Sequence, residues 1–113
     1  MSNIRTFRDE KEVYYETGKS KYLEGTRIKP GQVVKLTHLA ATFQNAATTE
    51  YVELGYWNGH GYVELKKAAP AVAGYFIHWD GEVYLREEQY IYAYFADVSD
   101  GELMTLRGLG RWM

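Results

Sequence analysis

The chain of 113 residues carries a formal net charge of −2, with 46% hydrophobic and 25% charged residues. This length and composition predict one globular domain and exclude a disordered chain. The absence of cysteine excludes disulfides, zinc–thiolate sites and thiol catalysis. No apolar run approaches the roughly 20 residues of a membrane helix. Because residues 1–10 also lack the apolar stretch of a secretory signal, we expect a soluble protein that is made intracellularly.

The charged residues are unevenly distributed. Residues 1–30 hold seven Lys or Arg and five Asp or Glu, whereas residues 31–113 hold six and ten. Neither part contains the cluster of basic residues that binding to nucleic-acid phosphates requires. Nucleic acid is therefore not expected to be the main ligand.

The first 32 residues show little regular spacing of apolar residues. They are expected to form an extended N-terminal arm or a partly ordered extension, residues 1–32, ahead of the main domain. Within this segment, Glu12–Glu16 is compatible with a short strand, and Thr17–Ser20 would then turn the chain. Pro30-Gly31 predicts a type II turn, because Pro suits its second position and Gly the positive φ of its third.

A strand-rich pattern begins at Val33. Val33–Phe43 reads as one long extended segment, and Tyr51–Trp57 alternates strictly between apolar and polar faces. Asn58-Gly59 then predicts a hairpin turn of type I′, which His60-Gly61 extends, before the chain returns over Tyr62–Leu65. This hairpin should direct the apolar residues of both strands toward one core.

The remaining sequence predicts four more strands, at Val72–Trp79, Val83–Leu85, Gln89–Ala96 and Glu102–Arg107. Asp80-Gly81 predicts a hairpin turn between the first two of them. Any helix should be limited to one or two turns, because no window of the sequence combines a 3.6-residue period with caps. The predicted fold class is all-β: a single β-sandwich or jelly-roll-like domain of about seven or eight strands over residues 33–113.

The titratable residues form no recognisable catalytic or metal-binding motif. His38, His60 and His78 are far apart in the sequence, so a metal site would need them to converge in the folded chain. The predicted turns contain three aspartates (Asp80, Asp97 and Asp100), and Asp is favoured in turns because its side chain accepts backbone hydrogen bonds. We therefore expect no enzyme activity, no metal and no cofactor.

The aromatic residues, 16% of the chain, are the feature of the sequence that points to a function. Alternation over Gln89–Ala96 predicts that Ile91, Ala93 and Phe95 face the core. The opposite face then carries a tyrosine row, which we define as Tyr90, Tyr92 and Tyr94. Such a row suits an oligomer interface, a sugar-binding platform or packing beneath the N-terminal segment. Further candidate interface residues are Tyr14, Tyr15 and Trp112.

The order of cues from Val33 to the C-terminus resembles that of small β-sandwich structural proteins of tailed bacteriophages. These cues are Thr48–Gly55, His78–Leu85, Tyr90–Phe95 and Asp100–Leu103. The resemblance implies a non-enzymatic virion component of the head, neck or tail, made in the host cytoplasm. It also implies assembly with copies of itself and with other virion proteins, with the arm reaching onto a neighbouring subunit.

A second function class remains open, a soluble carbohydrate-binding module that uses the tyrosine row and Trp57. The weakly patterned first 30 residues favour the assembly protein, because such a segment contributes little to a binding module but can tie subunits together.

Overall fold

The residues that the structure describes form eight strands, most of them where apolar and polar residues alternate along the chain. The computed structural model describes residues 5–43, 51–69 and 76–113. The strands are β1 (Thr6–Tyr14), β2 (Tyr22–Glu24), β3 (Val34–Phe43), β4 (Val52–Trp57), β5 (Tyr62–Ala68), β6 (Phe76–Leu85), β7 (Tyr90–Phe95) and β8 (Leu103–Trp112). None of the described residues forms a helix long and apolar enough to cross a membrane.

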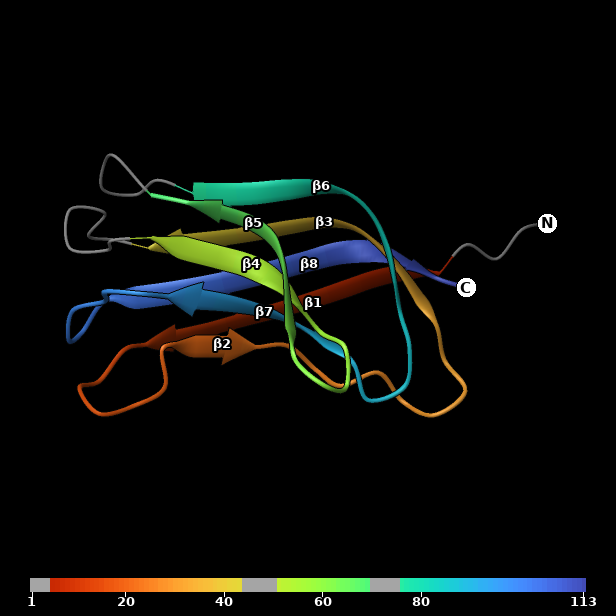
Figure 1. Ribbon diagram of the computed structural model, residues 1–113, viewed down its shortest axis with the longest axis horizontal. Helices are drawn as coiled ribbons and strands as arrows, with labels where there is room; N and C mark the ends of the chain where they lie inside the picture. Colours follow the sequence, from red (N-terminus) through yellow and green to blue (C-terminus); the bar gives the residue numbers. More distant parts are fainter. Residues whose placement is uncertain (1–4, 44–50, 70–75) are drawn as a thin grey trace.

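The strands lie in two antiparallel four-stranded sheets that face each other (Figure 1). The first sheet has the order β1-β8-β3-β6 and the second the order β2-β7-β4-β5. Most connections cross from one sheet to the other, which is the jelly-roll arrangement. The predicted all-β sandwich is confirmed.

The core lies between the sheets and takes one face of nearly every strand. Its buried apolar members include Phe7, Val34, Leu36, Leu39, Val52, Leu54, Ile77, Leu85, Ile91, Ala93, Phe95, Met104 and Leu106. The predicted inward faces of Tyr51–Trp57 and Gln89–Ala96 are confirmed by these residues. On β5, Leu65 is half-buried against the same core.

The N-terminal segment differs from the expected arm. Residues within 1–32 supply one strand to each sheet: β1 pairs with β8 along its whole length, and β2 pairs with β7. Phe7 is buried in the core, and buried Asp9 accepts a hydrogen bond of 2.6 Å from the backbone N–H of Thr26. The expected boundary at residue 33 therefore does not divide the structure, because a β-sandwich of this order needs both strands.

The predicted hairpin at Asp80-Gly81 is wrong. The chain continues through both residues as the single strand β6. Gly81 suits this path, since a Cβ there would lie only 2.5 Å from the ring of Trp79. An Asp-Gly pair marks a turn only when the flanking strands pair with each other, and here β6 pairs with β3 instead.

The other predicted turns form at the expected places. Gly31 has a φ of 79°, and the N–H of Gln32 donates to the carbonyl of Lys29, as a type II turn over Pro30-Gly31 requires. The β4–β5 hairpin is closed by residues 58–61, and the Asn58 side chain accepts hydrogen bonds from the N–H groups of His60 and Gly61. The loop is thus longer than the two residues of a type I′ turn.

Candidate functional site

An aromatic cluster covers the outer face of the β2-β7-β4-β5 sheet. The tyrosine row lies on this face, as the alternation of β7 predicts, since the residues between its members are in the core. The row is not exposed as a whole: Tyr90 is 6% and Tyr92 0% accessible, and Tyr94 is half-buried. Of the three roles considered for the row, packing beneath the N-terminal segment describes Tyr92 and Tyr94, which lie against Tyr22.

Rings from the neighbouring strands cover the row. Tyr22 of β2 stacks on Tyr62 of β5 with ring centroids 4.5 Å apart, and this pair spans the strands between them. Tyr62 meets Tyr92 edge-on at 4.6 Å, and Tyr22 lies 4.6 Å from Tyr94. Trp57 stacks on Tyr90 at 6.2 Å. Alternation within one strand does not predict that these rings cover the tyrosine row, because the rings belong to strands that become neighbours only in the sheet.

Two carboxylates anchor the hydroxyl groups of the cluster. The hydroxyls of Tyr62 and Tyr90 both donate to Glu24 Oε2, at 2.9 and 2.7 Å. The hydroxyl of Tyr92 donates to Glu53. Burial, together with the hydrogen bond to Glu53, raises the pKa of Tyr92, and burial raises the pKa of Tyr62 and Tyr90 in the same direction. The cluster is thus held by ring packing and by charge-assisted hydrogen bonds.

Gly55 of β4 creates the space that Tyr92 fills. A Cβ at this position would lie 2.9 Å from Cε1 of Tyr92 and 1.9 Å from the backbone oxygen of Val63. The register between β4 and β5 also shifts between Leu54 and Gly55. Gly55 therefore leaves room for the Tyr92 ring on the outer face, where the rings of Tyr22 and Tyr62 cover it.

The other candidate interface residues lie at opposite ends of β1. Tyr14 is 61% accessible at its end, while the adjacent Tyr15 is buried. Half-buried Trp112 lies beside the start of β1, where its ring meets Phe7 edge-on at 5.4 Å and the guanidinium of Arg5 at 5.8 Å. Tyr15 and Trp112 therefore stabilise this chain, and Tyr14 presents an accessible ring.

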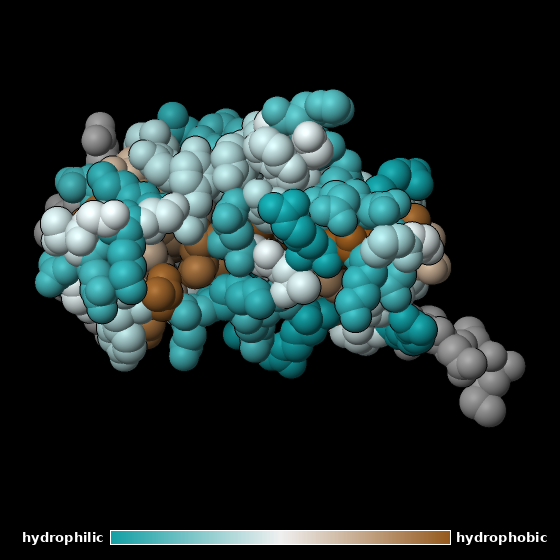
Figure 2. Space-filling view, turned by 90° about the horizontal axis from the view of Figure 1, so that it is seen from below, coloured by the Kyte–Doolittle hydropathy of each residue, from teal (hydrophilic) through white to brown (hydrophobic). Residues whose placement is uncertain are grey.

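Separate hollows, which we together call the groove, lie on the side of the sandwich where β1 and β2 form the edges of their sheets. Figure 2 views this side and shows hydrophobic side chains at the bottom of hollows between hydrophilic ones. One hollow of about 240 Å³ includes Val13, Tyr14, Tyr22, Leu23 and Met104 in its lining. Val13 and Tyr14 are exposed at its rim. This groove is an accessible apolar surface next to two strand edges that pair with no further strand among the described residues.

Comparison with known proteins identifies the fold. No protein-family model and no curated protein matches the sequence. A chain of the acidic stable capsid structure of Helicobacter pylori bacteriophage KHP30 matches with a TM-score of 0.67 and 11% identity, covering 95% of this chain and 87% of that one. A chain of the cyanophage Pam1 capsid asymmetric unit matches with a TM-score of 0.58 and 6% identity, over 97% and 86% of the two chains.

A third similar structure comes from outside the phages. The Eiger TNF protein of S. frugiperda matches with a TM-score of 0.54 and 9% identity, over 96% of this chain and 92% of that one. At these identities the likeness concerns the fold alone. At that level, the expected resemblance to phage structural proteins is confirmed.

Proposed function

We propose that this protein is a non-enzymatic structural component of a bacteriophage virion, which assembles with copies of itself and with other virion proteins. The observation that carries the proposal is the match to the KHP30 capsid chain, which covers 95% of this chain and 87% of that one. A second phage capsid chain shares the fold. Because one fold serves many functions, the function also depends on the accessible surface of this chain.

The groove between β1 and β2 is the surface that suits assembly. Edge strands present unpaired backbone groups, and an apolar hollow beside them lets a neighbouring copy bury side chains while it pairs with the edge. Tyr14 projects at the rim and combines a large apolar body with a polar tip, a residue type that is enriched at interfaces. Of the interface residues expected from the sequence, Tyr14 therefore becomes the main contact.

Light scattering on the purified chain over a range of concentrations tests this proposal. We expect the mass to rise above that of one chain, and Tyr14→Ser to raise the concentration needed for assembly by about tenfold, the effect of roughly 1.4 kcal/mol at an interface. Tyr84→Ser is the matched control, because Tyr84 is also an exposed tyrosine but lies on β6, at the opposite edge of the sheet that contains β1. A chain that stays monomeric at every concentration would contradict self-assembly.

A carbohydrate-binding module is the second candidate, favoured by the 39% accessible ring of Tyr62 beside Trp57 and the carboxylate of Glu24. Aromatic rings and carboxylates are suitable sugar contacts. Against it, the face of Tyr62 is occupied by Tyr22, and its hydroxyl is already bonded to Glu24. A glycan array separates the two functions: a sugar module loses its signal in Tyr62→Ala and keeps it in Tyr14→Ser.

A further inference from the structure

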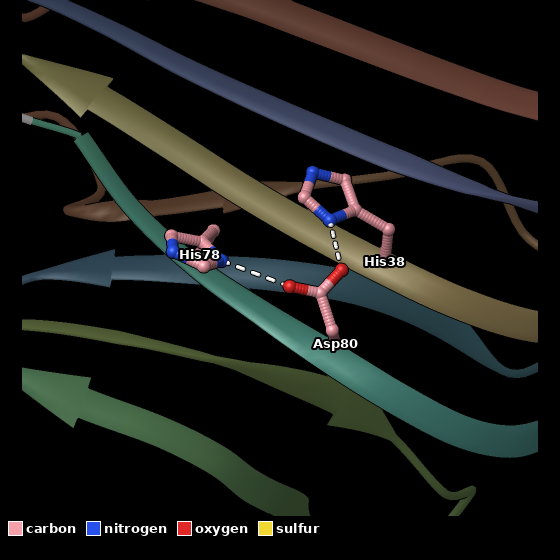
Figure 3. Close-up of side chains that lie close together, drawn as sticks. All are labelled: His38, His78 and Asp80. Carbon is pink, nitrogen blue, oxygen red and sulfur yellow. Dashed lines mark hydrogen bonds and ion pairs between the residues drawn. The ribbon is translucent and has the colours of Figure 1, made fainter.

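Two histidines and an aspartate converge on the outer face of the β1-β8-β3-β6 sheet (Figure 3). Nδ1 of His38 lies 2.8 Å from Oδ1 of Asp80, and Nδ1 of His78 lies 3.0 Å from Oδ2 of the same carboxylate. One ligand atom of each residue lies within 4.8 Å of the other two. Residues 42 positions apart in the sequence are therefore brought to one spot.

A β-bulge aims His38 at this spot. Val34 and Leu36 face the core, so strict alternation would direct His38 inward as well. The register of β3 shifts against both of its neighbours between Leu36 and His38, and from there Leu39 takes the inward position. His38 is thereby turned to the outer face, directly opposite Asp80 in the pairing with β6.

The strand β6 supplies the other two groups at i and i+2, on one face of an extended chain. It is an edge strand, so the cluster is open to solvent on one side. On the same pair of strands, Lys35 forms an ion pair with Glu82 at 2.5 Å. Hydrogen bonds from His38 and His78 lower the pKa of the Asp80 carboxyl, so this group is ionised at neutral pH. The cluster thus presents an anionic oxygen and two imidazoles.

We propose that His38, His78 and Asp80 form a binding site for a divalent late transition-metal ion such as Zn²⁺. Imidazole nitrogens with one carboxylate oxygen suit Zn²⁺, Co²⁺ or Ni²⁺, whereas Mg²⁺ and Ca²⁺ prefer sites made of oxygen atoms. Metal–ligand bonds of about 2.0–2.2 Å at tetrahedral angles place ligand atoms roughly 3.3 Å apart. The two nitrogen–oxygen separations need to lengthen by only a few tenths of an ångström to reach that value. The third separation, between the two imidazole nitrogens, is within 4.8 Å and reaches it by a rotation of the exposed His78 ring.

The ion would lie between the two Nδ1 atoms and the Asp80 carboxylate. Each imidazole would then turn the lone pair of Nδ1 to the metal and carry its proton on Nε2. Three protein ligands leave a coordination position open on the solvent side of β6, for water or for a side chain of another molecule.

Titration of the untagged, chelator-treated full chain with Zn²⁺ by calorimetry tests the site. We expect one ion per chain, and a visible absorption band with Co²⁺ that Zn²⁺ displaces. Each of His38→Gln, His78→Gln and Asp80→Asn should weaken binding by about tenfold or more. His60→Gln is the matched control, since His60 is an exposed histidine in the β4–β5 turn, and it should bind as the natural protein does. Mg²⁺ and Ca²⁺ should give no saturable binding.

Binding that is unchanged in the three cluster variants, or that never saturates at one equivalent, overturns the proposal. If a variant fails to fold, histidine ring signals in the NMR spectrum of the natural protein decide the question instead. Zn²⁺ should shift the signals of His38 and His78 and leave those of His60 in place. Equal shifts in all three histidines overturn the site.

Discussion

At the scale of single residues, the burial of Tyr92 on the outer face depends on the absence of a side chain at Gly55. Gly55→Ala places a Cβ 1.9 Å from the backbone oxygen of Val63 and 2.9 Å from Tyr92. Because a backbone atom cannot rotate away, β4 and β5 must separate, and we expect a loss of about 1–3 kcal/mol in the free energy of unfolding, measured by urea denaturation. Gly61→Ala is the control, since nothing lies within 4 Å of its added methyl group. Equal losses in the two variants would contradict this account.

The tyrosines of the aromatic cluster should make the folded protein less stable at alkaline pH. Burial raises the pKa of Tyr22, Tyr62, Tyr90 and Tyr92 above the ordinary value of 10.0. In the unfolded chain these groups ionise near pH 10, while the folded chain still holds their protons. The unfolded state then binds fewer protons, so stability is present below pH 10 and is lost as the pH rises above it.

Thermal unfolding at about pH 8 and at about pH 11, on either side of the usual tyrosine pKa, measures this loss. Tyr92→Phe removes one of the groups with a raised pKa. Its unfolding temperature should therefore fall less between the two pH values than that of the natural protein. A fall as large as that of the natural protein would mean that Tyr92 does not contribute.

At the scale of elements, β1 belongs to the folded domain. It pairs with β8 over all nine of its residues and brings Phe7 into the core. Truncating a buried Phe alone costs about 3–5 kcal/mol, a large share of the 5–15 kcal/mol that stabilises a typical domain. Deleting residues 1–14 should therefore abolish cooperative unfolding, as followed by circular dichroism. Deleting residues 1–4 is the control, because it leaves the β1–β8 ladder intact. A folded 15–113 fragment would restore the arm as the correct description.

At the scale of the whole molecule, strict alternation predicted the strands and their inward faces because the period of a strand is a local property. The pattern of Val52 and Leu54, or of Ile91 and Phe95, needs no knowledge of the partner strand. The turn at Pro30-Gly31 was predictable for the same reason, since its backbone angles depend on those two residues. The sequence by itself thus determined the all-β class and most of the elements.

Only the tertiary structure decided which strands are neighbours, and the candidate sites depend on that. The sequence of β1 predicts an arm, because its pairing with β8 cannot be seen in the sequence. Asp80-Gly81 predicts a turn, because the pairing of β6 with β3 cannot be seen there either. His78 and Asp80 have the spacing of residues on one face of a strand, but the assignment of Asp80 to a turn concealed this relation. His38 joins that pair only through a bulge, and Tyr92 is buried only by rings from β2 and β5. Such contacts join residues far apart in the chain, and no local pattern specifies them.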